Sequence, residues 1–344
     1  MRDAFFVLRS QTTGRPSTLD NRFPTGWDLK KMTLFIIRRL CLAGLIMVGA
    51  AMSAFFLLSL APGNPAEAIL TAERADYPQF DEVARFMETN NLNSPTLVQL
   101  TQWYIMLSQG NLGTSLRTGE PVLAEFWDRF PATMELALAS ILLAILLALP
   151  LGVISAVKRN SLLDHGARLA ALWGVSMPNF WLGLLLILFF GVILGWLPTY
   201  GRGTFCHLIL PAITLGTGLT AVLMRLQRAS MLEVLNTNYI RTAKAKGLSE
   251  AKVIGRHAFR NTLIPVVTII GIQFAHLLSG VVIVEQIFAW PGIGNFLLDG
   301  INAKDYPVIQ GFVLMIALFF VLSNLAVDVL YALLDPRIRY ERSM

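Results

Sequence analysis

Two ionisable residues lie inside long apolar runs of the sequence, where a charge is costly. Asp328 belongs to the run that ends at Leu333, and His276 to the run that ends at Val284. Because an ionised carboxylate in a membrane-spanning helix costs about 2.5 to 3.5 kcal/mol, Asp328 is expected to avoid lipid. It could line a pathway for a cationic substrate or form a buried hydrogen bond with Asn324. His276 could bind a metal ion or respond to protons, but no cysteine or carboxylate stands three or four residues away, which favours a packed histidine.

Motifs for catalysis and for nucleotide binding do not occur in this sequence. It has no Gly-x-x-x-x-Gly-Lys-Ser/Thr segment, whose backbone and lysine would hold nucleotide phosphates. It also has no paired carboxylates, no Ser/His arrangement and no cluster of metal-ligating residues. Cys41 and Cys206 are its two cysteines, too few for a disulfide framework. We therefore expect no catalytic residue, no metal site and no cofactor bound by this chain.

The most informative segment is a basic connection, residues 225–262, between two apolar runs. Its first part has a helical composition, and Tyr239 to Lys246 form a second predicted helix. That helix is expected to end at Gly247, because glycine adopts the left-handed conformation without steric cost. Ser249 then stands where it could cap a third helix that begins at Glu250. The pattern predicts a compact helical projection that a partner can bind.

The composition indicates which environment surrounds these segments. Of the 344 residues, 55% are hydrophobic and 15% are charged, whereas an average soluble domain carries about 25% charged residues. This excludes a disordered chain and argues against a soluble enzyme. Six apolar runs are long enough to cross about 30 Å of hydrocarbon as helices, so we expect an all-α membrane protein with six transmembrane helices. The expected spans are residues 34–60, 134–157, 167–194, 208–224, 263–284 and 308–333.

The distribution of Lys and Arg predicts the orientation of these spans. Cytoplasmic loops of membrane proteins carry an excess of both residues. Of the 28 Lys and Arg, 22 fall on the side that holds the two termini and the 225–262 connection, and six fall on the other side. Both termini are therefore expected in the cytoplasm, with the chain as a multi-pass protein of the cytoplasmic (inner) membrane. The same asymmetry explains the net charge of +6 without a nucleic acid partner.

The connections outside the spans suggest a division of the chain. Residues 1–31 are polar and are expected to form a mobile cytoplasmic tail, residues 32–339 the transmembrane domain, and residues 340–344 a second tail. Residues 61–133 form the largest outward insert. Within it, Asp81 to Met87 and Leu97 to Leu107 have apolar residues at helical spacing, which predicts short amphipathic helices. This insert could contact a component delivered from outside, or it could simply cap the bundle.

The 225–262 connection resembles that of the membrane-spanning subunits of ABC importers, in their peptide and nickel branch. The family's core pattern begins Glu-Ala-Ala and places a glycine after three further residues. Here the stretch is Arg241, Thr242, Ala243, Lys244, Ala245, Lys246 and Gly247, with arginine at the acidic position. Further strings similar to the family are IIRRL (36–40), APGNP (61–65), GNLGTSL (110–116), SMPNFW (176–181), EQIFAWPGIG (285–294), DYPVIQG (305–311) and DPRIR (335–339).

The resemblance implies a fold, partners and a mechanism. The fold would be that of a type I ABC importer permease. The partners would be one or two cytoplasmic ATPase subunits that bind ATP and Mg, a second homologous permease subunit in a heterodimer, an extracytoplasmic solute-binding protein and the lipid bilayer. The residues implied in coupling to the ATPase are Tyr239, Arg241, Thr242, Ala243, Lys244, Ala245, Lys246, Gly247 and Leu248. The chain would supply half of a translocation pathway that opens alternately to each side.

Two further segments are candidates for functional roles. Met177, Pro178 and Asn179 are expected to kink the third span, because Pro178 removes a backbone hydrogen bond. The opened turn could line the passage together with His276 and Asp328, or it could be a packing kink.

The segment from Glu285 to Gly294, with Trp290, Pro291 and Gly292, lies at the outer end of the fifth span. It is expected to form an outer gate or a docking surface for the binding protein, and interfacial anchoring of the tryptophan is the alternative.

The substrate is the least determined part of this interpretation. The strings YIRTAKAKGL (239–248) and DYPVIQG favour dipeptides or oligopeptides, whereas SMPNFW and the short connection 197–207 are equally similar to nickel or metal-chelate importers. A secondary transporter that works alone is a second alternative. Such proteins usually contain internal repeats and several intramembrane charges, and this sequence has no convincing repeat and one isolated intramembrane aspartate.

Overall fold

The structure, a computed structural model, describes residues 29–74 and 78–334. The chain divides into two units within its first helix, residues 1–42 and residues 43–344. Of the first unit, only the beginning of helix α1 (Leu29–Ser59) is described, and every later element belongs to the second unit. The tail expected at residues 1–31 lies outside the described residues except for the first three residues of α1. The tail expected at residues 340–344 lies wholly outside them.

The described residues are almost entirely helical, which confirms the expected all-α class. The first half of the chain forms α1, α2 (Pro65–Arg74), α3 (Phe80–Thr89), α4 (Thr96–Ser108), α5 (Val122–Val157), α6 (Leu162–Ser176), α7 (Asn179–Leu186) and a π-helix, η1 (Ile187–Ile193). The second half forms α8 (Phe205–Leu235), α9 (Asn238–Ala245), α10 (Glu250–Lys252), a second π-helix, η2 (Val253–Ala258), α11 (Phe259–Ile287), α12 (Ile293–Ala303) and α13 (Tyr306–Leu334).

Within the described residues, four helical segments are long and apolar enough to cross a membrane. They are Ile37–Ser59, Val122–Val157, Phe205–Leu235 and Tyr306–Ala326, and the bent pair Leu162–Ser176 and Asn179–Ile193 would make a fifth if it counts as one span. The expected fifth span, residues 263–284, falls within α11, some of whose side chains lie outside the described residues. The count of six spans and the cytoplasmic termini therefore stay predictions.

The third expected span, residues 167–194, is not one continuous helix. The chain leaves the helical conformation at Met177 and Pro178, both extended, and the two helical segments on either side are bent by 106°. Proline disfavours the helical conformation of the residue before it, so Met177 cannot continue α6. The kink predicted at Pro178 is thus a complete break, and α7 runs in a new direction.

The core of the second unit forms where α5 packs along α8. A Cβ atom added to Gly216 of α8 would lie 2.9 Å from the backbone oxygen of Ser140 in α5, so glycine permits the two backbones to approach closely. Towards the ends of these helices, Leu136 packs with Leu210, and Ala156 packs with Met231. The structure thus joins two of the expected spans along much of their length.

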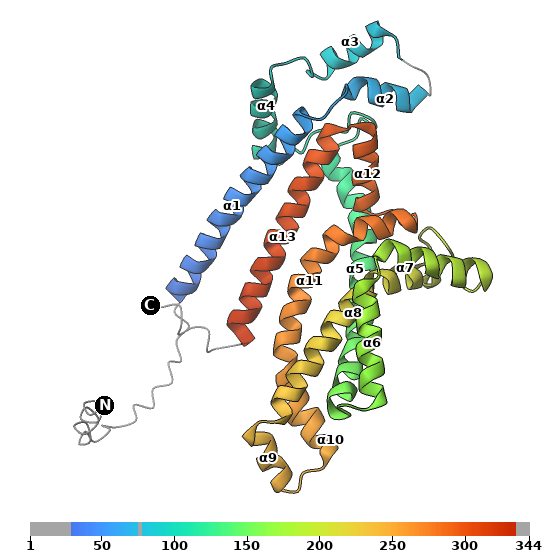
Figure 1. Ribbon diagram of the computed structural model, residues 1–344. Coiled ribbons are helices and arrows are strands. Elements are labelled where there is room, and N and C mark those ends of the chain that lie inside the picture. The colour runs from blue at the N-terminus through green and yellow to red at the C-terminus, as the bar shows by residue number, and fades with distance from the viewer. Residues whose placement is uncertain (1–28, 75–77, 335–344) are drawn as a thin grey trace, which may run out of the picture. The chain divides into compact units, whose positions relative to one another are not determined.

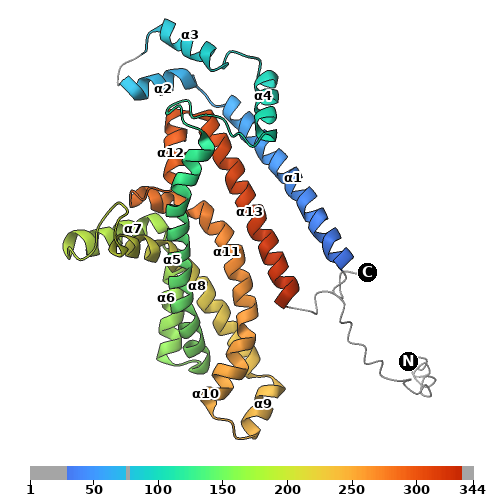
Figure 2. The same cartoon turned by 180° about the vertical axis from the view of Figure 1, so that it is seen from behind.

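Two groups of short helices lie at opposite ends of this unit. Figure 1 shows α9 and α10 beyond one end of α5, α8 and α11, and α2, α3 and α4 beyond the other end, and Figure 2 shows the same from behind. Helices α3 and α4 confirm the two short helices predicted in the outward insert, whereas α2 and α12 were not predicted. The 225–262 connection therefore lies at the end of the unit that is remote from the insert.

Candidate functional site

Helix α9 is fastened to the rest of the unit by its apolar face. Ile240 is fully buried and Ala243 nearly so, and both belong to a cluster with Met231 of α8 and Val253 of η2. A helix of eight residues is too short to be stable alone in water. Its conformation therefore depends on this contact, and α9 is held rigidly on the ends of α8 and η2.

The turn after α9 has the geometry that the sequence predicts. Gly247 has a φ of +76°, which confirms the expected left-handed glycine. Its N–H donates to the carbonyl of Lys244 at 3.0 Å, and the N–H of Leu248 donates to the carbonyl of Ala243 at 3.4 Å. These two bonds form a Schellman motif, which satisfies carbonyls left unpaired at a helix end. The turn thus fixes the direction in which the chain leaves α9.

The expectation of a third regular helix capped by Ser249 is only partly right. Ser249 occupies the position before α10, but its side chain makes no capping hydrogen bond. Helix α10 has three residues and continues directly into η2, whose backbone follows the wider π-helical pattern. The segment that leads into α11 is therefore π-helical and not regular α-helix. Short π-helical segments often occur at functional sites.

The other face of α9 is exposed and basic. The side chains of Arg241, Thr242, Lys244 and Lys246 are exposed, and those of Tyr239 and Leu248 are exposed beside them. The hydroxyl of Tyr239 accepts a hydrogen bond from Asn261 Nδ2 at 2.8 Å, which links the start of α9 to α11. One face of this helix is thus anchored while the opposite face is open to a partner.

A buried ion pair lies close to the base of this projection, and the sequence pattern alone did not predict it. Arg228 of α8 donates from Nε and Nη2 to the two carboxylate oxygens of Asp164 in α6, each at 2.8 Å. Asp164 is fully buried and also accepts from the Ser155 hydroxyl of α5 and from the N–H of Asn160. Three helices therefore meet at one carboxylate.

A sequence signal for this pair existed. Arg228 follows Met224 by four residues and precedes Met231 by three, and both methionines are buried. Residues at these spacings share one face of a helix. A charged residue on a buried face needs an opposite charge nearby, so the pattern could have indicated a partner, although not which one.

The segment from Glu285 to Gly294 forms a closed loop around a buried carboxylate. Glu285 accepts hydrogen bonds from the Thr133 hydroxyl of α5 and from the N–H of Gly294, the latter at 2.7 Å. Trp290 is 1% exposed, and its indole N–H donates to the carbonyl of Ala132 at 2.8 Å. Because Glu285 and Trp290 are buried, they hold the loop in place, and lipid anchoring of the tryptophan is wrong for this structure. The roles of Pro291 and Gly292 in gating or docking stay predictions.

The residues expected along the passage are not brought together in one described site. Pro178 is exposed, and Met177 and Asn179 are partly exposed, at the break between α6 and α7. The side chains of His276 and Asp328 lie outside the described residues. In the part of the chain that the structure describes, no group of three His, Cys, Asp or Glu side chains could hold a metal ion.

The geometry can be compared with known proteins. Residues 148–340 match the family described as binding-protein-dependent transport system inner membrane component. This chain belongs to that family. A relative from Pseudomonas aeruginosa (strain UCBPP-PA14), the di/tripeptide transport system permease protein DppB, is 45% identical in an alignment of length 339 that covers 90% of this chain and 100% of the relative.

Other relatives have the same extent. The oligopeptide transport system permease protein AppB of Bacillus subtilis (strain 168) is 41% identical, and the glutathione transport system permease protein GsiC of Salmonella choleraesuis (strain SC-B67) is 42% identical. Each alignment covers 90% of this chain and 100% of the relative. None of these three names refers to nickel, so the nickel alternative gains no support from them.

A solved structure shows a similar fold. The inward-facing MetNI methionine ABC transporter gives a TM-score of 0.54 at 19% identity, over 63% of this chain and 99% of that chain. At this identity the likeness concerns the fold alone. Together with the family, it shows that the chain is a permease subunit of an ABC importer and that the family is a transporter membrane component, not an ATPase.

Proposed function

We propose that this chain is one of two permease subunits in a peptide importer and that α9 with its Gly247 turn receives the movement of a partner ATPase. The three relatives named above carry peptides or glutathione in their names, which supports short peptides as the substrate. ATP and Mg bind to the ATPase subunits, an extracytoplasmic binding protein delivers the substrate, and a second homologous permease completes the passage in the inner membrane.

The observation that carries this proposal is the two-sided character of α9. Its buried face, with Ile240 and Ala243, packs on α8 and η2, whereas Arg241 and Lys244 point into solvent. A force applied to the exposed face therefore moves α8 and the start of α11 instead of bending a loose loop. Because α8 packs along α5, a tilt of this group changes which side of the membrane the passage opens to.

The basic face also specifies the partner's surface. Lys and Arg attract acidic groups, and their complementary charges raise association rates and fix the register of docking. We therefore expect the groove of the ATPase that receives α9 to carry acidic residues near Arg241 and Lys244. The arginine at the acidic position of the family pattern fits such a groove.

The Gly247 turn offers a test in the assembled complex, reconstituted in vesicles. A Cβ atom at Gly247 would meet no other atom within 4 Å, so a substitution acts through its backbone conformation and not through a clash. Gly247→Val introduces a β-branched residue at a φ of +76°, which such residues rarely adopt. We expect ATP hydrolysis to continue while peptide uptake falls at least tenfold.

Gly247→Asn is the matched control, because asparagine tolerates the left-handed conformation better than other residues with a side chain. It should retain most of the uptake and its coupling to hydrolysis. Both variants should purify as intact complexes. Normal peptide uptake by Gly247→Val in an intact complex would refute the proposed role of the turn.

A further inference from the structure

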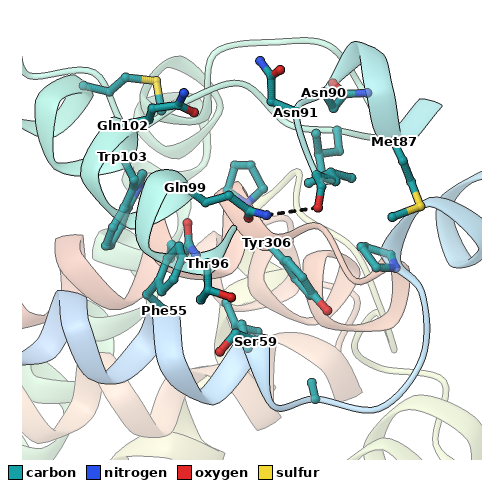
Figure 3. Close-up of a pocket in the computed structure, with 18 of the residues that line it drawn as sticks. Phe55, Ser59, Met87, Asn90, Asn91, Thr96, Gln99, Gln102, Trp103 and Tyr306 are labelled. Atoms are coloured by element: carbon teal, nitrogen blue, oxygen red, sulfur yellow. Dashed lines mark hydrogen bonds between the residues drawn. The ribbon is translucent and has the colours of Figure 1, made fainter. Parts of the chain in front are cut away.

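A cavity of about 360 Å³ lies under the outward insert, and none of the functions above uses it. Its walls come from the end of α1, from α3 and α4 of the insert, and from the start of α13. Figure 3 shows Phe55, Thr96, Gln99, Trp103 and Tyr306 around it. Its volume lies at the lower end of the range for small-ligand pockets, about 300 to 1,000 Å³.

The wall of this cavity is polar but uncharged. Among the described residues, no Asp, Glu, Lys, Arg or His lines it, although such residues are frequent elsewhere in the insert. Five primary amides line it instead, namely Asn90, Asn91, Gln99, Gln102 and Gln310. A cavity without cations does not suit a phosphate or a free carboxylate, and a cavity without carboxylates does not suit a metal ion. The lining suits a neutral ligand that both donates and accepts hydrogen bonds.

Some of these groups are already oriented by the chain. Gln99 Nε2 donates to the carbonyls of Leu92 and Ser94 at 3.0 and 2.8 Å, and Asn90 Nδ2 donates to the carbonyl of Phe86 at 2.9 Å. The amide nitrogens are thereby engaged, and the side-chain oxygens stay as acceptors. Fixed acceptors of this kind bind a ligand with less loss of side-chain freedom than mobile ones.

One buried polar atom in the wall makes no hydrogen bond within the described part of the chain. The indole Nε1 of Trp103 is buried without a partner there, although the ring itself is stacked on Phe55. A buried polar group without a partner is uncommon in folded proteins and requires an explanation. The carbonyl of a bound ligand would supply a partner for this N–H.

We propose that this cavity binds an uncharged stretch of peptide main chain. Peptide groups alternate one donor with one acceptor and carry no charge, as the amide-lined wall requires. The apolar side chains of Phe55, Met87 and Met106 add contacts for small side chains of the ligand. The bound stretch could belong to a transported peptide or to an extended loop of the protein that delivers it. The inference does not depend on the coupling role of α9.

The test measures protection of a single thiol in the purified transport complex, held in lipid nanodiscs without ATP. Cys41 and Cys206 are exposed and are replaced by serine. Thr96→Cys then places the thiol in the cavity wall, and Ser108→Cys places it on the same helix outside the wall. Maleimide labelling is followed with N-acetyl-trialanine amide, a neutral probe, and separately with the purified binding protein.

We expect one of the two additions to slow labelling at Thr96→Cys at least fivefold and to leave labelling at Ser108→Cys unchanged. Protection by the blocked peptide identifies a free peptide as the source, and protection by the binding protein alone identifies a loop of that protein. Trp103→Phe keeps the ring but removes the indole N–H, so it should weaken the protection about fivefold. Absence of protection by both additions at saturating concentration would overturn the proposal. The assay needs no ATP hydrolysis, so a failure of coupling leaves its result intact.

Discussion

Removal of Arg228 from its ion pair is expected to be strongly destabilising. In the variant Arg228→Met, Asp164 keeps its charge in a position where its side chain is fully buried, and the two charge-assisted bonds at 2.8 Å are lost. Hydrogen bonds to charged groups contribute about 1.5 to 3 kcal/mol each. Breaking a buried ion pair from one side costs about 3 to 5 kcal/mol, because the other charge stays buried without a partner.

The companion variant Asp164→Asn should lower the free energy of unfolding by less than Arg228→Met does. The remaining Arg228 side chain is 19% exposed and can reach water, whereas the introduced amide oxygen can still accept from the N–H of Asn160. The double variant removes both charges, so it should be about as stable as Asp164→Asn alone. Arg225→Met is the matched control, because Arg225 lies one turn earlier on α8 and is exposed. Arg225→Met is expected to lower the free energy of unfolding by about 0.5 kcal/mol or less.

Thermal unfolding of the purified complex in detergent measures these differences. At about 2 °C per kcal/mol, Arg228→Met should lower the melting temperature by about 6 to 10 °C and Arg225→Met by about 1 °C. The double variant should melt at a temperature close to that of Asp164→Asn and well above that of Arg228→Met. If the two single losses simply add in the double variant, Asp164 and Arg228 are not coupled, and the reasoning from a buried ion pair is refuted.

Two further predictions concern close packing and the loop around Glu285. Gly216→Ala should lower the free energy of unfolding by about 1 to 3 kcal/mol, because its Cβ would lie 2.9 Å from the backbone oxygen of Ser140. A Cβ at Gly218 would have its nearest atom 4.0 Å away. Gly218→Ala should therefore leave the stability unchanged or raise it by about 0.5 to 1 kcal/mol. Equal melting temperatures for these two variants would contradict the packing. Glu285→Ala removes the acceptor for the N–H of Gly294 and should cost roughly 2 to 4 kcal/mol, while Glu285→Gln, which keeps an acceptor oxygen, should cost less than half of that. Thermal unfolding checks both pairs, and equal losses for the two Glu285 variants would show that the acceptor does not matter.

Features set by neighbouring residues could be predicted from the sequence. The two short helices of the insert, α3 and α4, follow from apolar residues three and four positions apart, and the left-handed turn follows from Gly247 after a short helical stretch. The break at Pro178 was located correctly for the same reason, because proline restricts its own residue and the one before it. Its size was underestimated, since the angle of 106° depends on what the two segments pack against.

Features that join distant parts of the chain could not be predicted in this way. The Thr133 hydroxyl meets Glu285 across 152 positions, and the Ser115 hydroxyl meets Asp305 across 190 positions. No local pattern specifies such a partner, because many serines and threonines have the same neighbours in sequence. Helix α12 was missed for a related reason, because its start is fixed by the carboxylate of Glu285 and not by a capping residue of its own.

Helix α8 connects α9, which is proposed to receive the movement of the ATPase, with helices that α9 itself does not contact. Arg228 and Met231 are three residues apart, which separates them by about 4.5 Å along the helix. Met231 packs under α9, whereas Arg228 is bonded to Asp164 at the start of α6. Apolar contacts permit sliding, but two bonds to one carboxylate fix direction as well as distance. A displacement of α9 that reaches Met231 must therefore carry the start of α6 with it. In the proposed mechanism, the group of helices that moves with α9 would therefore include α6, whose other end is the break at Pro178.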